Sequence, residues 1–443
     1  MYLQEFKKVV RLGAPMVVTQ LLWMSMPVVD NIMVGSLGGD ALAALAIAGA
    51  YFTFFLVGMI GVISAINPMV SQAHGAKDYA LIPKIVHQGL ISAFILSTAM
   101  VVGLSFSNRI LLLLGQPEHL VRLGSEYLHA MAFGVPFQAL FICLRQFCDG
   151  VEDPKPTIVM VFLASILNIP FDYVLIHGAY GFPKLGVAGA GVATSTLNAF
   201  LALGLLAYTF KSKKYKAYFV WKNFHFSKSL FHEIWRVGGP SAGTFLAEVG
   251  YFASSTLLVG LLGASEVASH QIALNIASVS FMIPMGLGFA VSVRVGHYVG
   301  MKKQNEVQVP WSIGMVMALI ISIGAALLFY FGGEYLVRIY TSDPAIVILG
   351  TKLLKIAGIF QVFDALQAMG VQSLKGLKDT KLPFLYTMIS YWIVGMGVSV
   401  YCGFHLLWGP EGVWFGMVVS LLLVAVLLWR RFIILTRPKL TSS

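Results

Sequence analysis

The sequence predicts an all-α integral membrane protein with about twelve transmembrane helices in two six-helix lobes, related by pseudo-twofold symmetry along the membrane normal. Its composition, the length of its apolar segments and an internal repeat indicate this class. Hydrophobic residues make up 58% of the 443 residues, charged residues make up 11%, and the mean hydropathy is +0.82. Soluble domains usually carry about 25% charged residues. Helices are the expected spanning elements, because lipid cannot satisfy the open edges of a sheet.

Apolar segments of about 20 residues or more mark the expected spans. They lie near residues 12–35, 43–71, 85–107, 124–147, 157–176, 187–210, 234–261, 267–293, 311–331, 346–374, 383–407 and 412–432. Several prolines fall in or beside these segments, where neighbouring helices can cover the carbonyl groups that a proline frees. The number of segments is even, so both termini are expected on the same side of the membrane.

The basic residues indicate which side this is. With both termini in the cytoplasm, 24 of the 30 Lys and Arg residues fall on inner segments, including Arg294 in the region 294–308 and Lys375 in the loop 375–381. This bias follows the positive-inside rule. The net charge of +11 is therefore explained by orientation in a lipid bilayer, and it requires no nucleic-acid partner.

The chain repeats itself after about 225 residues. Residues 11–15 (RLGAP) match 236–240 (RVGGP) at an offset of 225, residues 150–155 match 376–381 at 226, and Gly186 matches Gly409 at 223. Such a small drift indicates duplication of a six-helix unit with parallel copies, an architecture typical of secondary transporters. We expect an N-lobe at 1–210, a cytoplasmic linker at 211–233 and a C-lobe at 234–443.

Acidic residues inside apolar segments are the main functional candidates, since a carboxylate at the bilayer centre costs roughly 2.5–3.5 kcal/mol on insertion scales. Asp30 lies one turn after Pro27, which loosens its helix and is a candidate hinge. Asn168 and Asp172 share a helix face at i, i+4. With a hydroxyl from Thr194, these oxygens suit Na⁺, while two repelling carboxylates suit H⁺. The alternative is that Asp30 and Asp172 are interfacial, solvated or capping residues.

The second half carries different acids. Glu248 and Asp364 lie near the middle of their expected spans, and Gln361 and Gln367 flank Asp364 at i−3 and i+3. We expect an acidic site for a cation or a substrate here, with Gln361, Gln367 and Ser255 as further polar residues of a cavity. The alternative is a buried structural ion pair.

A short acidic stretch contains Asp149, Glu152 and Asp153. It is similar to the acidic metal clusters of membrane prenyltransferases, which would bind Mg²⁺. The matching loop in the second half contains lysines, so loop solvation and helix capping are the better interpretation. We therefore expect no enzyme, no catalytic residue and no prosthetic cofactor.

The chain resembles the multidrug and toxic compound extrusion (MATE) transporters of the NorM type. The resemblance rests on the sequences at 13–15 and 27–35, on the spacing from Pro240 to Glu248, on Asp364 and on residues 376–380. It implies twelve helices in two lobes in a bacterial inner membrane. It also implies export of cationic, lipophilic drugs in exchange for Na⁺ or H⁺.

By the same resemblance, Asp30, Asn168, Asp172 and Thr194 form an N-lobe cation site, with Na⁺ at the first three. Glu248 and Asp364 form a C-lobe acidic site. Some members have a tyrosine where this chain has Phe360, which offers no oxygen ligand. Distant relatives of the same superfamily flip lipid-linked glycans, an alternative that would require basic groups in the cavity.

Overall fold

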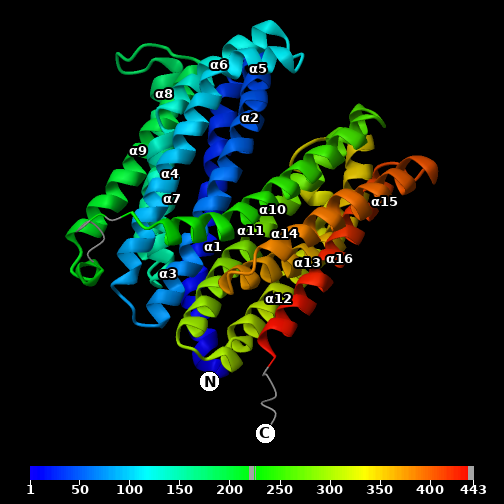
Figure 1. Cartoon of the computed structure of the whole chain (residues 1–443). Helices are drawn as coiled ribbons and strands as arrows, with labels where there is room; N and C mark the ends of the chain where they lie inside the picture. Colours follow the sequence, from blue (N-terminus) through cyan, green and yellow to red (C-terminus); the bar gives the residue numbers. More distant parts are fainter. Residues whose placement is uncertain (219–223, 225, 438–443) are drawn as a thin grey trace. The chain divides into compact units, whose positions relative to one another are not determined.

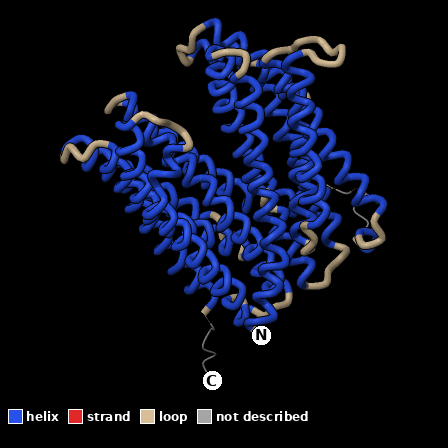
Figure 2. Tube along the Cα trace, turned by 180° about the vertical axis from the view of Figure 1, so that it is seen from behind, coloured by secondary structure: helices blue, strands red, loops and turns tan. Residues whose placement is uncertain are grey.

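The computed structural model describes residues 1–218, 224 and 226–437. Almost all of them are helical, and Figure 2 shows no strand among the described residues. The α-helices, labelled in Figure 1, are α1 (Tyr2–Gly35), α2 (Gly39–Ile63), α3 (Ile66–Gly75), α4 (Leu81–Ser105), α5 (Ser107–Leu113), α6 (Glu118–Ala132), α7 (Val135–Gly150), α8 (Lys155–His177), α9 (Val187–Lys211), α10 (Lys228–Gly260), α11 (Ala264–Gly300), α12 (Gln308–Arg338), α13 (Pro344–Gly376), α14 (Lys381–Met388), α15 (Met396–Val400) and α16 (Pro410–Thr436). Two 3-10 turns, η1 (Tyr215–Ala217) and η2 (Gln304–Glu306), and two π-helical stretches, η3 (Ile389–Gly395) and η4 (Tyr401–His405), complete the order.

The helices are long and apolar enough to span a membrane. In the described part of the chain, 11 spans meet this test, and the bent pair α6 and α7 makes a twelfth if it is counted as one span. The bend is 52° and falls just before Pro136, at the start of α7. Proline breaks the continuous hydrogen bonding of a helix, which explains the bend. The predicted all-α membrane class with about twelve spans is confirmed.

Arg294 and Lys375 lie in helices, whereas the predicted spans end one residue before each of them, so the predicted loop placement of Lys375 is wrong. Arg294 is 2% exposed in α11, and Lys375 is 3% exposed in the last turn of α13. The Lys375 ammonium lies 6.0 Å and 5.9 Å from the ring centroids of Phe245 and Phe289. Aromatic faces attract a cation, and so they help to compensate for its burial. Arg294 instead has a carboxylate partner.

The chain divides into two compact units. The C-unit comprises Met1–Gln20 and Gly243–Ser443, and the N-unit comprises Leu21–Ala242. Helix α1 therefore begins in the C-unit and continues into the N-unit, while α10 does the reverse. The predicted lobe boundaries stay a prediction, and residues 219–223 and 225 of the predicted linker and 438–443 of the predicted C-lobe lie outside the described residues.

Matched glycines hold each crossing helix in its unit. In the C-unit, a Cβ added to Gly286 of α11 would lie 2.6 Å from the Cα of Val17 in α1. In the N-unit, a Cβ added to Gly61 of α2 would collide with the backbone of Ala242 in α10. Both members of one pair are offset by 225 residues from the other pair. Glycine permits this close approach of helix backbones in both copies of the repeat.

A buried ion pair also fixes the start of α1 in the C-unit. Glu5 and Arg294 are each 2% exposed. The Arg294 Nε donates to Glu5 Oε1 at 2.5 Å, and its Nη2 donates to Oε2 at 2.9 Å. Tyr298 donates to the same Oε2 at 3.0 Å. Two parallel bonds and a third donor satisfy the carboxylate, which is the arrangement a buried charge requires.

Substitution of Gly286 by alanine should weaken the C-unit. The added methyl group meets the α1 backbone, so overpacking should lower the free energy of unfolding by about 1–3 kcal/mol. The measurement is the melting temperature of the purified protein in detergent. Gly324→Ala is the matched control, because nothing lies within 4 Å of its added Cβ. Equal melting temperatures for the two variants would contradict the packing argument.

Removal of one partner from the buried pair of Glu5 and Arg294 should lower the free energy of unfolding more than Gly286→Ala does. Glu5→Gln should lower the free energy of unfolding by about 3–5 kcal/mol, because it leaves Arg294 as an uncompensated buried charge. The same thermal measurement tests this. Replacement of both Glu5 and Arg294 by methionine should recover most of the loss. Glu306→Gln, which removes an exposed pair with Lys303, is the control and should change stability little.

Candidate functional site

The N-unit brings the four predicted polar residues together. Asn168 Nδ2 of α8 donates to Asp30 Oδ1 of α1 at 3.1 Å and to Asp172 Oδ2 at 2.9 Å. Thr194 Oγ1 of α9 donates to Asp30 Oδ2 at 3.3 Å. Asp30 is 7% exposed, and Asn168 and Asp172 are almost fully buried. The residues form one buried cluster from three helices, which is not a set of solvated interfacial side chains.

The two carboxyl groups of this cluster accept hydrogen bonds from the same amide nitrogen, Asn168 Nδ2, and so lie close together. Like charges in contact inside a protein repel strongly, so the pair needs a shared proton or a bound cation. Asn168 Oδ1 and Asp172 Oδ1 are buried and have no hydrogen-bond partner among the described residues. Together with the Asp30 carboxylate, they provide the oxygen ligands that hard cations prefer. The cluster can therefore accommodate either Na⁺ or H⁺.

Local sequence explains how the cluster forms. Pro170 lies between Asn168 and Asp172 in α8 and removes one backbone donor. Gly189 of α9 packs directly on α8, since an added Cβ would lie 2.7 Å from the carbonyl carbon of Leu175. This close packing brings Thr194 toward the cluster. The buried Tyr127 of α6 also lies within electrostatic range of both acids. Nothing in the sequence around Tyr127 predicted that it would lie near these acids.

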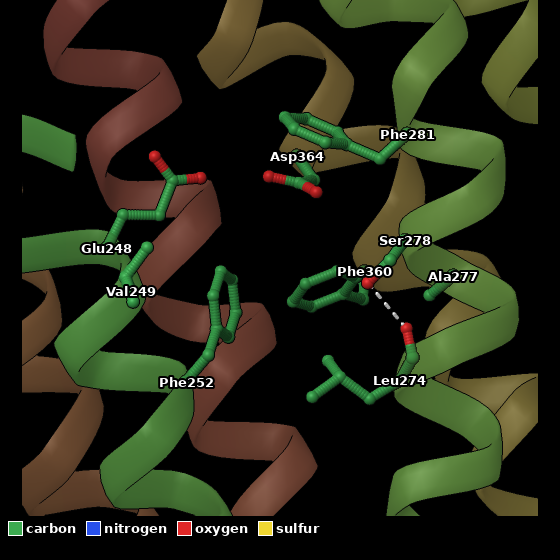
Figure 3. A pocket seen from close by; sticks show the side chains of 9 residues that line it. All are labelled: Glu248, Val249, Phe252, Leu274, Ala277, Ser278, Phe281, Phe360 and Asp364. Atoms are coloured by element: carbon green, nitrogen blue, oxygen red, sulfur yellow. Dashed lines mark hydrogen bonds between the residues drawn. The ribbon is translucent and has the colours of Figure 1, made fainter. Parts of the chain in front are cut away.

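The C-unit places the other two acids at one pocket. Glu248 of α10 and Asp364 of α13 line a cavity of about 200 Å³. Figure 3 shows both carboxylates directed into it, above a floor of aromatic and aliphatic side chains. The remaining lining residues are Val249, Phe252, Leu274, Ala277, Ser278, Phe281 and Phe360. An acidic end and aromatic walls suit a cation with an apolar or aromatic body.

The other predicted polar residues of this half have different environments. With its amide oriented to satisfy both ends, Gln361 donates to Ser280 Oγ at 3.1 Å and to Ala277 O at 3.2 Å. Ser255 is fully buried and donates to Tyr251 O at 2.9 Å. Neither residue lines the pocket. Gln367 is 2% exposed, and its Oε1 has no hydrogen-bond partner among the described residues.

A buried histidine supports the pocket wall from behind. Trp414 Nε1 donates to His270 Nδ1 at 3.0 Å, so Nε2 carries the proton that bonds Thr256 Oγ1 at 3.0 Å. The Trp414 ring packs edge-on against Phe360 with centroids 5.5 Å apart. Thr256 in turn donates to the carbonyl of Phe252. The network therefore holds both aromatic walls in place. The sequence did not predict this network, because single histidines and tryptophans in apolar segments show no pattern that links them.

The acidic stretch after α7 has partners. Asp149 lies 3.5 Å from Arg145, and Asp153 lies 2.8 Å from Lys214. Tyr215 also donates to Asp153 at 2.9 Å. Both aspartates are buried, so the predicted loop solvation is wrong for them. Asp149 pairs within α7, whereas Asp153 fastens the segment after α9 to the segment after α7. Within the described residues, no group of three or more His, Cys, Asp or Glu side chains could hold a metal ion.

Comparison with known proteins identifies the family. The MatE family model matches the chain twice, at residues 15–174 and 240–401, which supports the internal repeat. The chain is 34% identical to the multidrug resistance protein NorM of Vibrio cholerae over 97% of this chain and 95% of that protein. It is 32% identical to a probable NorM of Idiomarina loihiensis over 96% and 93%.

Solved structures share the fold. The eukaryotic MATE transporter AtDTX14 superposes with a TM-score of 0.88 at 23% identity, covering 98% of this chain and 97% of its own. A MATE transporter of Vibrio cholerae gives a TM-score of 0.90 at 18% identity, with 97% of each chain covered. The long matches at more than 30% identity decide the assignment. This chain therefore belongs to the MatE family, in its NorM branch, and is a transporter rather than an enzyme.

Proposed function

We propose that this protein is a secondary antiporter that exports cationic, lipophilic compounds in exchange for Na⁺ or H⁺. The observation that carries the proposal is a pair of separate buried acidic groups, one in each unit. The N-unit cluster of Asp30, Asn168, Asp172 and Thr194 is the proposed coupling-ion site. The relatives' names, multidrug resistance proteins, support the same function.

The C-unit pocket is the proposed site where substrate and ion compete. A buried carboxylate is costly unless a positive charge or a proton compensates it. A drug cation can supply that charge while its apolar body contacts Phe252, Phe281 and Phe360. Arrival of Na⁺ or H⁺ at Glu248 and Asp364 removes this attraction. Exchange follows because the two carboxylates attract either occupant but not both.

The proposed setting is a bacterial inner membrane with both termini in the cytoplasm. The uneven distribution of Lys and Arg supports this orientation. The two NorM relatives come from bacteria. In the structure, the N-terminus and the end of α16 also lie at the same end of the C-unit in both views (Figures 1 and 2).

Flipping of a lipid-linked anionic headgroup is the alternative that one observation favours. The buried Lys375 could attract a phosphate, but it stands over Phe245 and Phe289 and is not among the lining residues of the pocket. The charged residues that do line this pocket are both acidic. Cation export is therefore the better proposal.

Imposed gradients in proteoliposomes test the proposal. An inward Na⁺ or pH gradient should drive efflux of a fluorescent cationic dye by the wild type. Asp30→Asn, Glu248→Gln and Asp364→Asn should each reduce it at least about tenfold, since hydrogen bonds to charged groups are worth roughly 1.5–3 kcal/mol. Glu334→Gln, which changes an exposed carboxylate paired with Arg338, is the control. If neither gradient drives the dye, antiport is wrong.

Two threonines on α9 give a finer test of the N-unit site. Thr194 donates to Asp30, whereas the exposed Thr196 donates only to the carbonyl of Val192. Thr194→Ala should raise the concentration of coupling ion needed for half-maximal transport by about two- to tenfold. Thr196→Ala should leave it unchanged. An equal response of the two variants would show that the Thr194 contact with Asp30 has no part in ion binding.

A further inference from the structure

Tyr391 has a buried hydroxyl beside the acidic pocket of the C-unit. The residue is fully buried, and its hydroxyl has no hydrogen-bond partner among the described residues. Its ring stacks on that of Tyr251, which lies one turn after Glu248 in α10. Leaving a buried hydroxyl unpaired is unfavourable. The hydroxyl is therefore available to a ligand.

The local structure holds the ring of Tyr391 against α10. Tyr391 lies in the π-helical stretch η3, and such stretches are frequent at functional sites. Its ring stacks on Tyr251 of α10 with centroids 5.0 Å apart and an interplanar angle of 16°. The neighbouring Trp392 donates to the carbonyl of Ala247, the residue before Glu248. Two contacts thus hold η3 against the part of α10 that carries the acid.

Two other oxygens of the same unit are also without hydrogen-bond partners. Asp364 Oδ1 and Gln367 Oε1 are buried and unpaired among the described residues. Both come from α13, one turn apart. Gln367 and Tyr391 lie behind the residues that line the pocket, and each can offer a neutral oxygen from there. Phe360, on the pocket wall one turn before Asp364, offers none. Two carboxylates with neutral oxygens are a ligand set for a small hard cation.

The internal repeat relates Tyr391 to the helix that carries Asn168. The offsets of 226 before this segment and 223 after it put Tyr391 opposite residues 165–168 of α8. That stretch contains Asn168, which contacts both acids of the N-unit cluster. The same span of each repeat copy thus carries a polar side chain beside an acidic pair.

We propose that the Tyr391 hydroxyl is an oxygen ligand of the cation held by Glu248 and Asp364, with Gln367 as a second neutral ligand. The inference rests on the proposed function only in naming Na⁺ as the cation. It adds a residue from η3 to the site and explains how a pocket with phenylalanine at position 360 can still surround an ion with oxygen.

Equilibrium binding of radioactive Na⁺ to the purified full-length protein tests this, at fixed pH and ionic strength. The Asp30→Asn background confines the measurement to the C-unit. Tyr391→Phe removes one oxygen and keeps the ring stack, so it should raise the Kd for Na⁺ about tenfold. Gln367→Leu should raise it as well. Tyr401→Phe is the matched control, because Tyr401 lies in the same span but is exposed. The Kd of this variant for Na⁺ should equal that of the background.

The proposal is overturned if Tyr391→Phe binds Na⁺ within twofold of its background, or if the background itself binds none. Dye efflux separates this failure from failure of the proposed function. A wild type that couples efflux to a gradient, combined with an unchanged Kd in Tyr391→Phe, rejects the ligand and retains the antiporter. Restoration of affinity in Tyr391→Phe by Phe360→Tyr would support a requirement for a phenol oxygen at this pocket.

Discussion

Two close backbone contacts are the constraint on which the rest of this structure depends. One lies between α1 and α11 in the C-unit, and the other lies between α10 and α2 in the N-unit. Gly286 admits α1 to the C-unit at Val17, and Gly61 admits α10 to the N-unit at Ala242. Each of these two helices therefore belongs to both units. Pro240 lies two residues before the last N-unit residue of α10, and Pro15 lies five residues before the last C-unit residue of α1. Proline removes one hydrogen bond of the helix, so bending is least costly near these positions.

The two copies of the repeat have kept this packing and diverged in charge. Glu5 and Arg294 correspond to Leu230 and Met69 at the offset of 225, and both of these belong to one apolar cluster. One copy thus secures its crossing helix with a buried ion pair and the other with apolar contacts. Such exchanges are often neutral in stability, because the attraction of a buried pair barely offsets its desolvation. The acidic sites also differ between the copies: the N-unit has Asp30 and Asp172, and the C-unit has Glu248 and Asp364.

Sequence predicts those features that depend on segment length, period or spacing. The spans follow from apolar runs, the repeat from matching motifs, and the pairing of Asn168 with Asp172 from helical spacing. Other features depend on contacts between helices, which spacing cannot reveal. In the sequence, the charges of Arg294 and Lys375 place them outside the spans. Only the structure shows that Glu5 and two aromatic rings compensate for these charges inside helices. His270 and Tyr391 resemble ordinary packing residues, because nothing nearby in the sequence indicates what their polar atoms face.

In the proposed antiporter, helix α1 would offer a physical route from ion binding to movement. Its Glu5 end is fixed in the C-unit, while Asp30 lies in the N-unit cluster, about 37 Å further along at 1.5 Å per residue. An ion or proton bound at Asp30 would change the charge one turn after Pro27, which donates no backbone hydrogen bond to the helix. Because the other end is fixed by Arg294, a bend at Pro27 cannot be relieved by sliding of the whole helix. It must instead change how the N-unit part of α1 packs. Under this proposal, the buried ion pair would hold the C-unit end of α1 while the charge at Asp30 changes.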